Sequence, residues 1–198
     1  TMLSERHYLN NLRIASMSKG IPGDVVECGV WRGGIIAGIA ELIGGSKKFF
    51  LFDSFEGLPD AKDIDGVDAI KWQQNTGGDN YYNNASADIS YSKNLMDKTG
   101  VDYACIKGWF KDTLPKAEIK QISLLRLDGD WYESTMDCLT NLYPKVAENG
   151  IVIIDDYYAW DGCSKALHDY LSSISSVSRI RELGGVAYLI KKDKYVIS

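Results

Sequence analysis

Two short apolar runs each end in aspartate: Leu124-Leu125-Arg126-Leu127-Asp128 and Ile151-Val152-Ile153-Ile154-Asp155-Asp156. Runs of this length without polar alternation are typical of parallel strands that are covered on both faces. In an open α/β sheet, the carboxyl ends of such strands border the crevice in which ligands bind. The sequence therefore predicts three carboxylates around one crevice.

These carboxylates would repel one another unless a positive group lies between them. Oxygen ligands suit a hard divalent cation such as Mg²⁺, which makes Asp128, Asp155 and Asp156 candidate metal ligands. The alternative is that each acid caps the helix that follows it, where negative charge is favourable. For the set of three we favour metal or ligand binding.

The rest of the chain alternates between strand and helix patterns. Strands are expected at residues 25–30, 49–53, 103–107, 123–128, 151–156, 179–183 and 186–191, the last two forming a hairpin around Gly184-Gly185. Helices are expected at residues 3–19, 33–43, 87–98, 132–147 with an interruption at Pro144, and 162–172. This order predicts an α/β fold in one domain, residues 1–198: a doubly wound, mostly parallel seven-stranded sheet with an antiparallel C-terminal edge strand. Residues 1–21 would contribute the N-terminal helix.

Residues 60–88 are polar and only weakly periodic, with many Asn, Asp, Gly and Tyr residues. So long a stretch inside a compact domain is usually a functional loop or lid. Tyr81 and Tyr82 could close over a bound acceptor, or the segment could be an ordinary solvated loop.

The composition suits a globular protein without a broad nucleic-acid surface, because the net charge is −5. The four cysteines lack paired or metal-type spacing, so we interpret them as buried apolar residues in a reducing cytosol. We see neither a membrane span nor a signal peptide and expect a cytoplasmic protein. The chain begins with Thr1, so an upstream segment could be missing.

A glycine-rich turn follows the first expected strand: Glu27-Cys28-Gly29-Val30-Trp31-Arg32-Gly33-Gly34. Such a turn lets a ligand approach the backbone beside a helix N-terminus. The spacing is not the G-x-G-x-x-G of dinucleotide-binding proteins, and the alternative is close packing of helix on strand. Asp53, at the end of the second strand, could accept hydrogen bonds from ribose hydroxyls or serve as a turn acid. Trp109 and Phe110 could face a purine or belong to the core.

Several blocks resemble the macrocin-, mycinamicin- and novobiocin-type sugar O-methyltransferases. The first runs from Pro22 to Gly34, and the second is Phe52-Asp53-Ser54-Phe55-Glu56-Gly57-Leu58-Pro59. The others are Gly108-Trp109-Phe110 with Thr113-Leu114-Pro115, then Leu127-Asp128-Gly129-Asp130-Trp131-Tyr132-Glu133-Ser134-Thr135, then Ile154-Asp155-Asp156-Tyr157. They occur in order over most of residues 22–170, whereas residues 60–88 do not match closely.

The resemblance implies a class I methyltransferase that uses S-adenosylmethionine and Mg²⁺ to methylate a sugar hydroxyl of a glycosylated metabolite or a surface polysaccharide precursor. By that resemblance the metal ligands are Asp128, Asp155 and Asp156. The glycine turn and the acid that ends the second strand predict cofactor contacts at Glu27, Gly29, Gly33 and Asp53, with adenine near Trp109. The full set of cofactor residues that we expect is Glu27, Gly29, Trp31, Arg32, Gly33, Asp53, Ser54, Phe55, Gly108, Trp109, Phe110 and Asp128. We expect Asp128 to be the general base and Asp130 to be the second choice. The partner would be a small-molecule glycosyl acceptor, with no nucleic acid and no membrane, and a homo-oligomer could form.

Tyr157, Tyr158 and Trp160 follow the acidic pair and could form a wall of the acceptor pocket. Of the two histidines, we expect His168 to be structural, and His7 could face the cleft. Two other functions compete. An NAD-dependent oxidoreductase is disfavoured by the glycine spacing and the final hairpin. A catalytically silent cofactor-binding scaffold is disfavoured by the intact set of aspartates.

Overall fold

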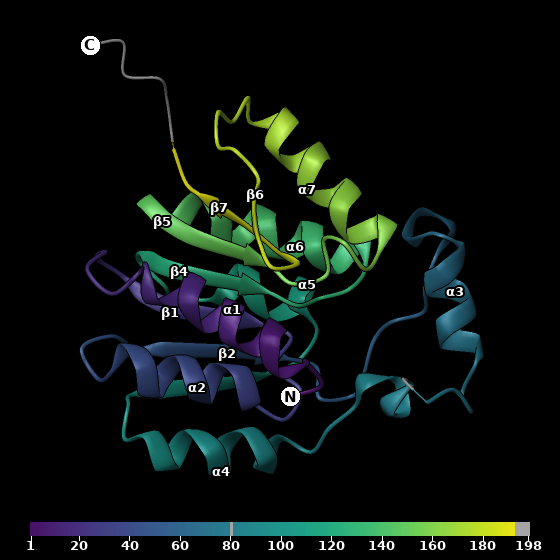
Figure 1. The fold of residues 1–198 in the computed structure, drawn as a ribbon, viewed down its shortest axis with the longest axis horizontal. Coiled ribbons are helices and arrows are strands. Elements are labelled where there is room, and N and C mark those ends of the chain that lie inside the picture. Colours follow the sequence, from purple (N-terminus) through teal and green to yellow (C-terminus); the bar gives the residue numbers. More distant parts are fainter. Residues whose placement is uncertain (80, 193–198) are drawn as a thin grey trace.

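The structure, a computed structural model, describes residues 1–79 and 81–192 as a seven-stranded sheet with helices on both faces (Figure 1). The strand order is β3-β2-β1-β4-β5-β7-β6. The strands are β1 Asp24–Cys28, β2 Phe49–Asp53, β3 Tyr103–Lys107, β4 Ile122–Leu127, β5 Val146–Ile154, β6 Arg181–Leu183 and β7 Val186–Ile190. The predicted fold class is confirmed.

Helices α1, α2 and α4 pack on one face of the sheet, and α5, α6 and α7 pack on the other. The helices are α1 Glu5–Ser16, α2 Gly34–Ile43, α3 Val67–Gln74, α4 Ile89–Thr99, α5 Phe110–Thr113, α6 Tyr132–Leu142 and α7 Asp161–Ser173. Short 3₁₀ turns occur at η1 Asp63–Asp65, η2 Tyr82–Ala85, η3 Leu114–Lys116 and η4 Tyr143–Lys145. The central strands contribute to both apolar cores, which explains why β4 and β5 read as unbroken apolar runs.

The C-terminal hairpin places its antiparallel strand one position inside the edge. β7 is antiparallel to both β5 and β6, so β6 is the outermost strand. Gly184 and Gly185 connect β6 to β7 with φ values of 57° and 92°. Two left-handed residues in succession suit a tight hairpin turn, which glycine adopts without strain.

The structure corrects two expected boundaries. The helix expected over residues 132–147 ends at Leu142, because Pro144 lies in the 3₁₀ turn that follows. β5 then begins at Val146 rather than at residue 151. Val146 pairs with Ile122 before the register of the strand pair shifts, so the strand contains an irregularity that its apolar pattern does not reveal.

A third difference from the sequence-based expectation concerns residues 60–88, which contain helix α3 and two 3₁₀ turns instead of a plain loop. We call residues 60–88 the flap. In Figure 1 the helix α3 lies beside the carboxyl ends of the parallel strands, away from the two helical layers.

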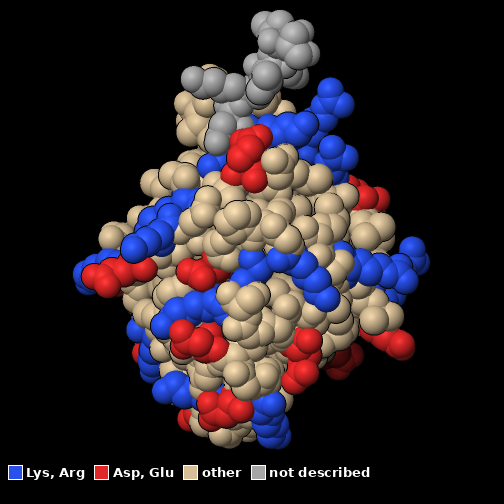
Figure 2. Space-filling view, turned by 90° about the vertical axis from the view of Figure 1, so that its left-hand side faces the viewer, with Lys and Arg blue, Asp and Glu red and all other residues tan. Residues whose placement is uncertain are grey.

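The surface at the opposite end of the strands has mixed charge. Figure 2 views the left-hand side of Figure 1 and shows Lys and Arg interspersed with Asp and Glu on that face. Within the described residues, no helix is both long and apolar enough to cross a bilayer.

Candidate active site

A cavity of about 600 Å³ lies at the carboxyl ends of the parallel strands. Its wall includes residues that follow β1, β2, β3, β4 and β5, together with Trp72 and Tyr82 of the flap. This volume is typical of pockets that hold small molecules and cofactors. The crevice predicted from the strand-end aspartates is therefore present.

The turn after β1 needs glycine for steric reasons. Gly29 has a φ of 88°, and a Cβ there would lie 1.7 Å from the carbonyl oxygen of Asp128. Gly33 has a φ of 79°, and its Cβ would lie 2.8 Å from the Cα of Ser92 in α4. Gly29 borders the cavity and makes room for the carbonyl of Asp128, whereas Gly33 allows α4 to pack closely, helix on helix rather than helix on strand. Approach of a ligand to this turn stays a prediction.

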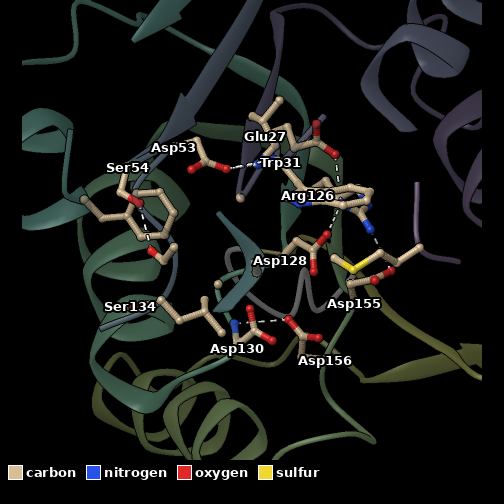
Figure 3. Close-up of a pocket in the computed structure, with 18 of the residues that line it drawn as sticks. Glu27, Trp31, Asp53, Ser54, Arg126, Asp128, Asp130, Ser134, Asp155 and Asp156 are labelled. Atoms are coloured by element: carbon tan, nitrogen blue, oxygen red, sulfur yellow. Dashed lines mark hydrogen bonds and ion pairs between the residues drawn. The ribbon is translucent and has the colours of Figure 1, made fainter. Parts of the chain in front are cut away.

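Asp53 fastens the turns after β1 and β2 (Figure 3). Its Oδ2 accepts hydrogen bonds from the backbone N–H groups of Val30 and Trp31, both at 2.7 Å. Its Oδ1 accepts one from the N–H of Phe55 at 2.6 Å. Trp31 and Phe55 have left-handed φ values of 48° and 55°, which are uncommon for residues with a side chain. Asp53 is thus a turn acid, and its contact with a ribose stays a prediction.

Arg126 is a buried cation at the centre of the site, with 1% of its side chain exposed. Its Nη1 lies 2.8 Å from Glu27 Oε1 and 2.8 Å from Asp128 Oδ2. Its Nη2 lies 2.9 Å from Asp155 Oδ1. Figure 3 shows the guanidinium between these three carboxylates. Sequence reasoning missed this residue because Arg126 lies within an apolar run; the available signal was a charged side chain in the middle of a buried strand.

One guanidinium does not neutralise three carboxylates, and the pKa values of Glu27 and Asp155 shift in opposite directions. Burial raises the pKa of Glu27 to about 8, although Arg126 opposes the shift. Burial also acts to raise the pKa of Asp155, but Arg126, with His7 and Asn11, lowers it to about 2. Glu27 Oε2 is buried without a hydrogen-bond partner among the described residues. The pKa values of these two neighbouring acids are therefore shifted in opposite directions, toward the neutral form for Glu27 and toward the ionised form for Asp155.

Helix α1 reaches the site through Asp155. Asn11 Nδ2 donates to Asp155 Oδ1 at 3.1 Å, and His7 Nε2 lies 3.4 Å from the same oxygen. Asn11 Oδ1 accepts from Arg126 Nε at 3.1 Å. His7 thus lies next to an acid of the site, whereas His168 is exposed on α7 and contacts the hydroxyl of Tyr157 at 2.9 Å.

A second group of acids lines the same cavity and shares Asp128 with the first: Asp128, Asp130 and Asp156 each place a carboxylate oxygen within 4.8 Å of the others. In the described part of the chain this is the set with metal-binding spacing, and it differs from the predicted set by Asp130 in place of Asp155. Burial, then the neighbouring acids, raises the pKa of Asp130 and of Asp156 well above the usual value. Oxygen atoms crowded in this way fit a hard divalent cation, which would relieve their repulsion.

Asp130 itself is held in an unusual conformation. Its φ is 57°, in the left-handed region. Its backbone N–H donates to Asp156 Oδ2 at 3.1 Å, and its Oδ1 accepts from the indole N–H of Trp160 at 3.0 Å. The turn after β4 therefore directs this carboxylate toward Asp156 and the cavity (Figure 3).

The predicted cofactor residues divide into two groups. Those that line the cavity are Glu27, Gly29, Trp31, Asp53, Ser54, Trp109, Phe110 and Asp128. Those that do not are Arg32, Gly33, Phe55 and Gly108. Arg32 is exposed and stacks on the rings of Trp31 and Tyr91, 4.5 and 5.1 Å from their centroids. Gly108, with a φ of 144°, makes room for Thr113.

The flap is fixed to the body of the protein by polar and aromatic contacts. Asp65 Oδ1 accepts from the backbone N–H of Tyr132, at the start of α6, at 2.7 Å. Trp131 Nε1 donates to the carbonyl of Pro59 at 2.8 Å. The ring of Trp72 in α3 lies 6.2 Å from that of Trp131 and 6.0 Å from that of Trp160. Of the tyrosines proposed to close the site, Tyr82 lines the cavity and Tyr81 packs on Trp72.

We compared the chain with known protein families. Residues 1–188 match the sequence profile of the family described as Macrocin-O-methyltransferase (TylF). The chain belongs to this family. The predicted resemblance is confirmed, because the match extends over nearly the whole length of the chain.

Curated relatives of this chain are named as O-methyltransferases. The chain is 35% identical over 176 residues to a tetracenomycin-rhamnoside 4'-O-methyltransferase of Streptomyces olivaceus, covering 85% of this chain and 66% of the relative. It is 35% identical over 173 residues to mycinamicin III 3''-O-methyltransferase of Micromonospora griseorubida, covering 82% of this chain and 66% of that protein. The chain thus spans slightly less than two thirds of these relatives.

Solved structures agree with the fold. The O-methyltransferase NovP superposes with a TM-score of 0.79 at 32% identity, over 97% of this chain and 82% of NovP. A methyltransferase of Podospora anserina, solved with S-adenosylhomocysteine, shares the fold alone, with a TM-score of 0.62 at 15% identity over 97% of this chain and 80% of that one. The architecture is therefore that of the class I methyltransferases, which implies S-adenosylmethionine as cofactor.

Proposed function

We propose that this chain is a Mg²⁺-dependent O-methyltransferase that transfers a methyl group from S-adenosylmethionine to a sugar hydroxyl of a glycosylated small molecule or a surface polysaccharide precursor. The observation that carries the proposal is one cavity that is lined both by the glycine turn after β1 and by a cluster of carboxylates. Membership of the family supports the reaction type.

The cofactor would lie along the ends of β1, β2 and β3. The buried, unpartnered Oε2 of Glu27 suits a cationic amino group, which the methionine part of the cofactor carries. Trp109 and Phe110 border the same cavity and offer an apolar surface to adenine. When bound, S-adenosylmethionine supplies an electrophilic methyl group. The residues of the cavity wall position the acceptor oxygen against it.

The metal would be held by Asp128, Asp155 and Asp156, with Asp130 beside them. Asp128 and Asp156 belong both to this set and to the cluster observed in the structure. The ion pair with Arg126 engages Oδ1 of Asp155, and Oδ2 makes no hydrogen bond or ion pair among the described residues. When bound, Mg²⁺ would stabilise negative charge on a coordinated sugar oxygen.

We assign proton removal to Asp130 in preference to Asp128. A sugar hydroxyl is protonated near neutral pH, so a nearby carboxylate has to accept its proton. Arg126 donates to Asp128 at 2.8 Å and stabilises its ionised form, which makes Asp128 the weaker base. Asp130 accepts only a neutral indole N–H among the side-chain donors of the described residues. The order of the two candidates is thus reversed from the expectation based on sequence.

Two experiments test the function. Thermal shifts with S-adenosylmethionine, NAD and Mg²⁺ separate it from an oxidoreductase, because a ligand that binds the folded state raises its apparent stability. Turnover separates it from a catalytically silent cofactor-binding scaffold. Methyl transfer is then measured on a panel of glycosides and nucleotide sugars. We expect stabilisation by S-adenosylmethionine and turnover of at least one glycoside with Mg²⁺. Stabilisation by NAD alone would contradict the proposal.

A further inference from the structure

We propose that Trp160 is a positioning residue: its indole N–H holds the Asp130 carboxylate in the orientation from which it removes the acceptor proton. This inference rests on the proposed function, in which Asp130 is the base. Both residues line the cavity, and the link between them is the hydrogen bond of 3.0 Å from Nε1 to Oδ1.

Asp130 depends on this bond because its other near neighbours are acids. Asp128 and Asp156 place carboxylate oxygens within 4.8 Å of its own. A cation bound to those acids would attract Asp130 as a further ligand. A ligated carboxylate is a poor base, since its lone pairs are directed at the metal. The indole N–H engages Oδ1 and thereby keeps the carboxylate in place for proton transfer.

The backbone of Trp160 is held by Asp156, one of the acids that would hold the metal. The carbonyl of Asp156 accepts hydrogen bonds from the N–H groups of Ala159 and Trp160, both at 3.0 Å. Trp160 also occupies the position that precedes α7, and its carbonyl accepts from the N–H of Ser164 at 3.3 Å. A residue anchored in this way has little freedom to move its indole away from Asp130.

The ring of Trp160 is fixed by two other tryptophans. Trp131 lies 5.2 Å away, centroid to centroid, and Trp72 lies 6.0 Å away, both with their rings edge to face. Such arrangements stabilise a buried ring beyond the effect of its area alone. Because Trp72 belongs to α3, the flap contributes to the placement of the indole that orients Asp130.

The experiment compares Trp160→Phe with Trp131→Phe in the full chain. Trp160→Phe keeps an aromatic ring and removes the N–H that reaches Asp130. The matched control removes an N–H from the same cluster, but that N–H bonds the carbonyl of Pro59. We expect Trp160→Phe to lower kcat by roughly 10- to 100-fold, the value of one hydrogen bond to a charged group, with little change in acceptor KM or in cofactor affinity. Trp131→Phe should chiefly raise acceptor KM.

A double-mutant cycle shows whether Trp160 acts through Asp130. In an Asp130→Asn background, Trp160→Phe should have no further effect on single-turnover rate, because the bond it removes no longer orients a base. Trp160→His retains a ring N–H, so its kcat should lie between those of the unchanged protein and Trp160→Phe. The histidine variant also replaces Trp160→Phe in the test if the phenylalanine variant is unstable. Unchanged kcat in both Trp160 variants, or equal losses with and without Asp130, would overturn the positioning role while the proposed function stands. Absence of methyl transfer by the unchanged protein would contradict both the positioning role and the proposed function.

Discussion

Replacement of Asp53 by Asn should destabilise the ligand-free protein. The carboxylate accepts three backbone N–H groups, from Val30, Trp31 and Phe55. Asparagine is nearly isosteric, but it keeps one acceptor oxygen and places an NH₂ group against N–H donors on the other side. At least one donor then loses its partner, and the remaining bonds lose their charge.

The size of the effect follows from these contacts. A hydrogen bond to a charged group contributes roughly 1.5–3 kcal/mol, and an unsatisfied donor costs about 1–3 kcal/mol. Asparagine can keep the two hydrogen bonds from the N–H groups of Val30 and Trp31 if its side-chain carbonyl faces them. The loss of the bond to Phe55 and of the charge should then lower the free energy of unfolding by about 2–4 kcal/mol. For a domain of this size, that corresponds to a fall in Tm of roughly 5–15 °C.

The assay is urea unfolding without ligands, followed by tryptophan fluorescence. Glu56→Gln is the control, because it removes a charge from the same turn. Glu56 is exposed and pairs with Lys107 at 3.3 Å on the surface, so its loss should change stability by less than about 1 kcal/mol. If Asp53 served only to bind ribose, Asp53→Asn would weaken cofactor binding and leave ligand-free stability unchanged. That result would refute the assignment of Asp53 as the acid that fastens both turns.

Three further predictions concern ligands. Replacing Asp128, Asp155 or Asp156 by Ala should lower methyl transfer far more than cofactor affinity, and EDTA should reproduce the loss until Mg²⁺ is restored; full turnover in metal-free buffer would exclude the metal. Because burial raises the pKa of Glu27 to about 8, the group is protonated at pH 7, and a cationic amino group at Oε2 should lower that pKa and release a proton. Calorimetry of S-adenosylmethionine binding in buffers of different ionisation enthalpy measures this release, which Glu27→Gln should abolish; identical heats in all buffers would contradict it. Finally, protease cleavage within the flap should slow when cofactor and acceptor are both bound, and equal cleavage rates would argue against a lid.

The strands and their terminal acids were predictable because the pattern is local. Parallel strands covered on both faces have a distinctive apolar sequence, and the residue after each strand faces the crevice. Asp128, Asp155 and Asp156 were therefore placed correctly at the cavity from sequence alone. The same reasoning located Asp53, although its observed partners are backbone N–H groups.

The interactions that organise the site were not predictable, since they join residues that are distant in the chain. Arg126 contacts Glu27 of β1 and Asp155 after β5 only because β4 lies between those strands. Asp65 of the flap accepts a hydrogen bond from the N–H of Tyr132 at the start of α6. No helix-capping pattern in the sequence near Tyr132 predicts this contact. The pairing of Asp130 with Trp160 likewise depends on how two strand-end turns face each other.

Leu58, which precedes the flap, lies beside Asn84 within it, and this contact bears on how the scaffold could acquire a new acceptor. The N–H of Leu58 donates to the carbonyl of Asn84 at 3.0 Å, and Asn84 Nδ2 returns a bond to the carbonyl of Leu58 at 2.8 Å. A segment whose ends already meet can be exchanged without moving the strands that carry it. Residues 59–83 are therefore a natural cassette for chimeras with other members of the family. Such a chimera should keep an acid at the position of Asp65, because this side chain accepts a hydrogen bond from the first N–H of α6.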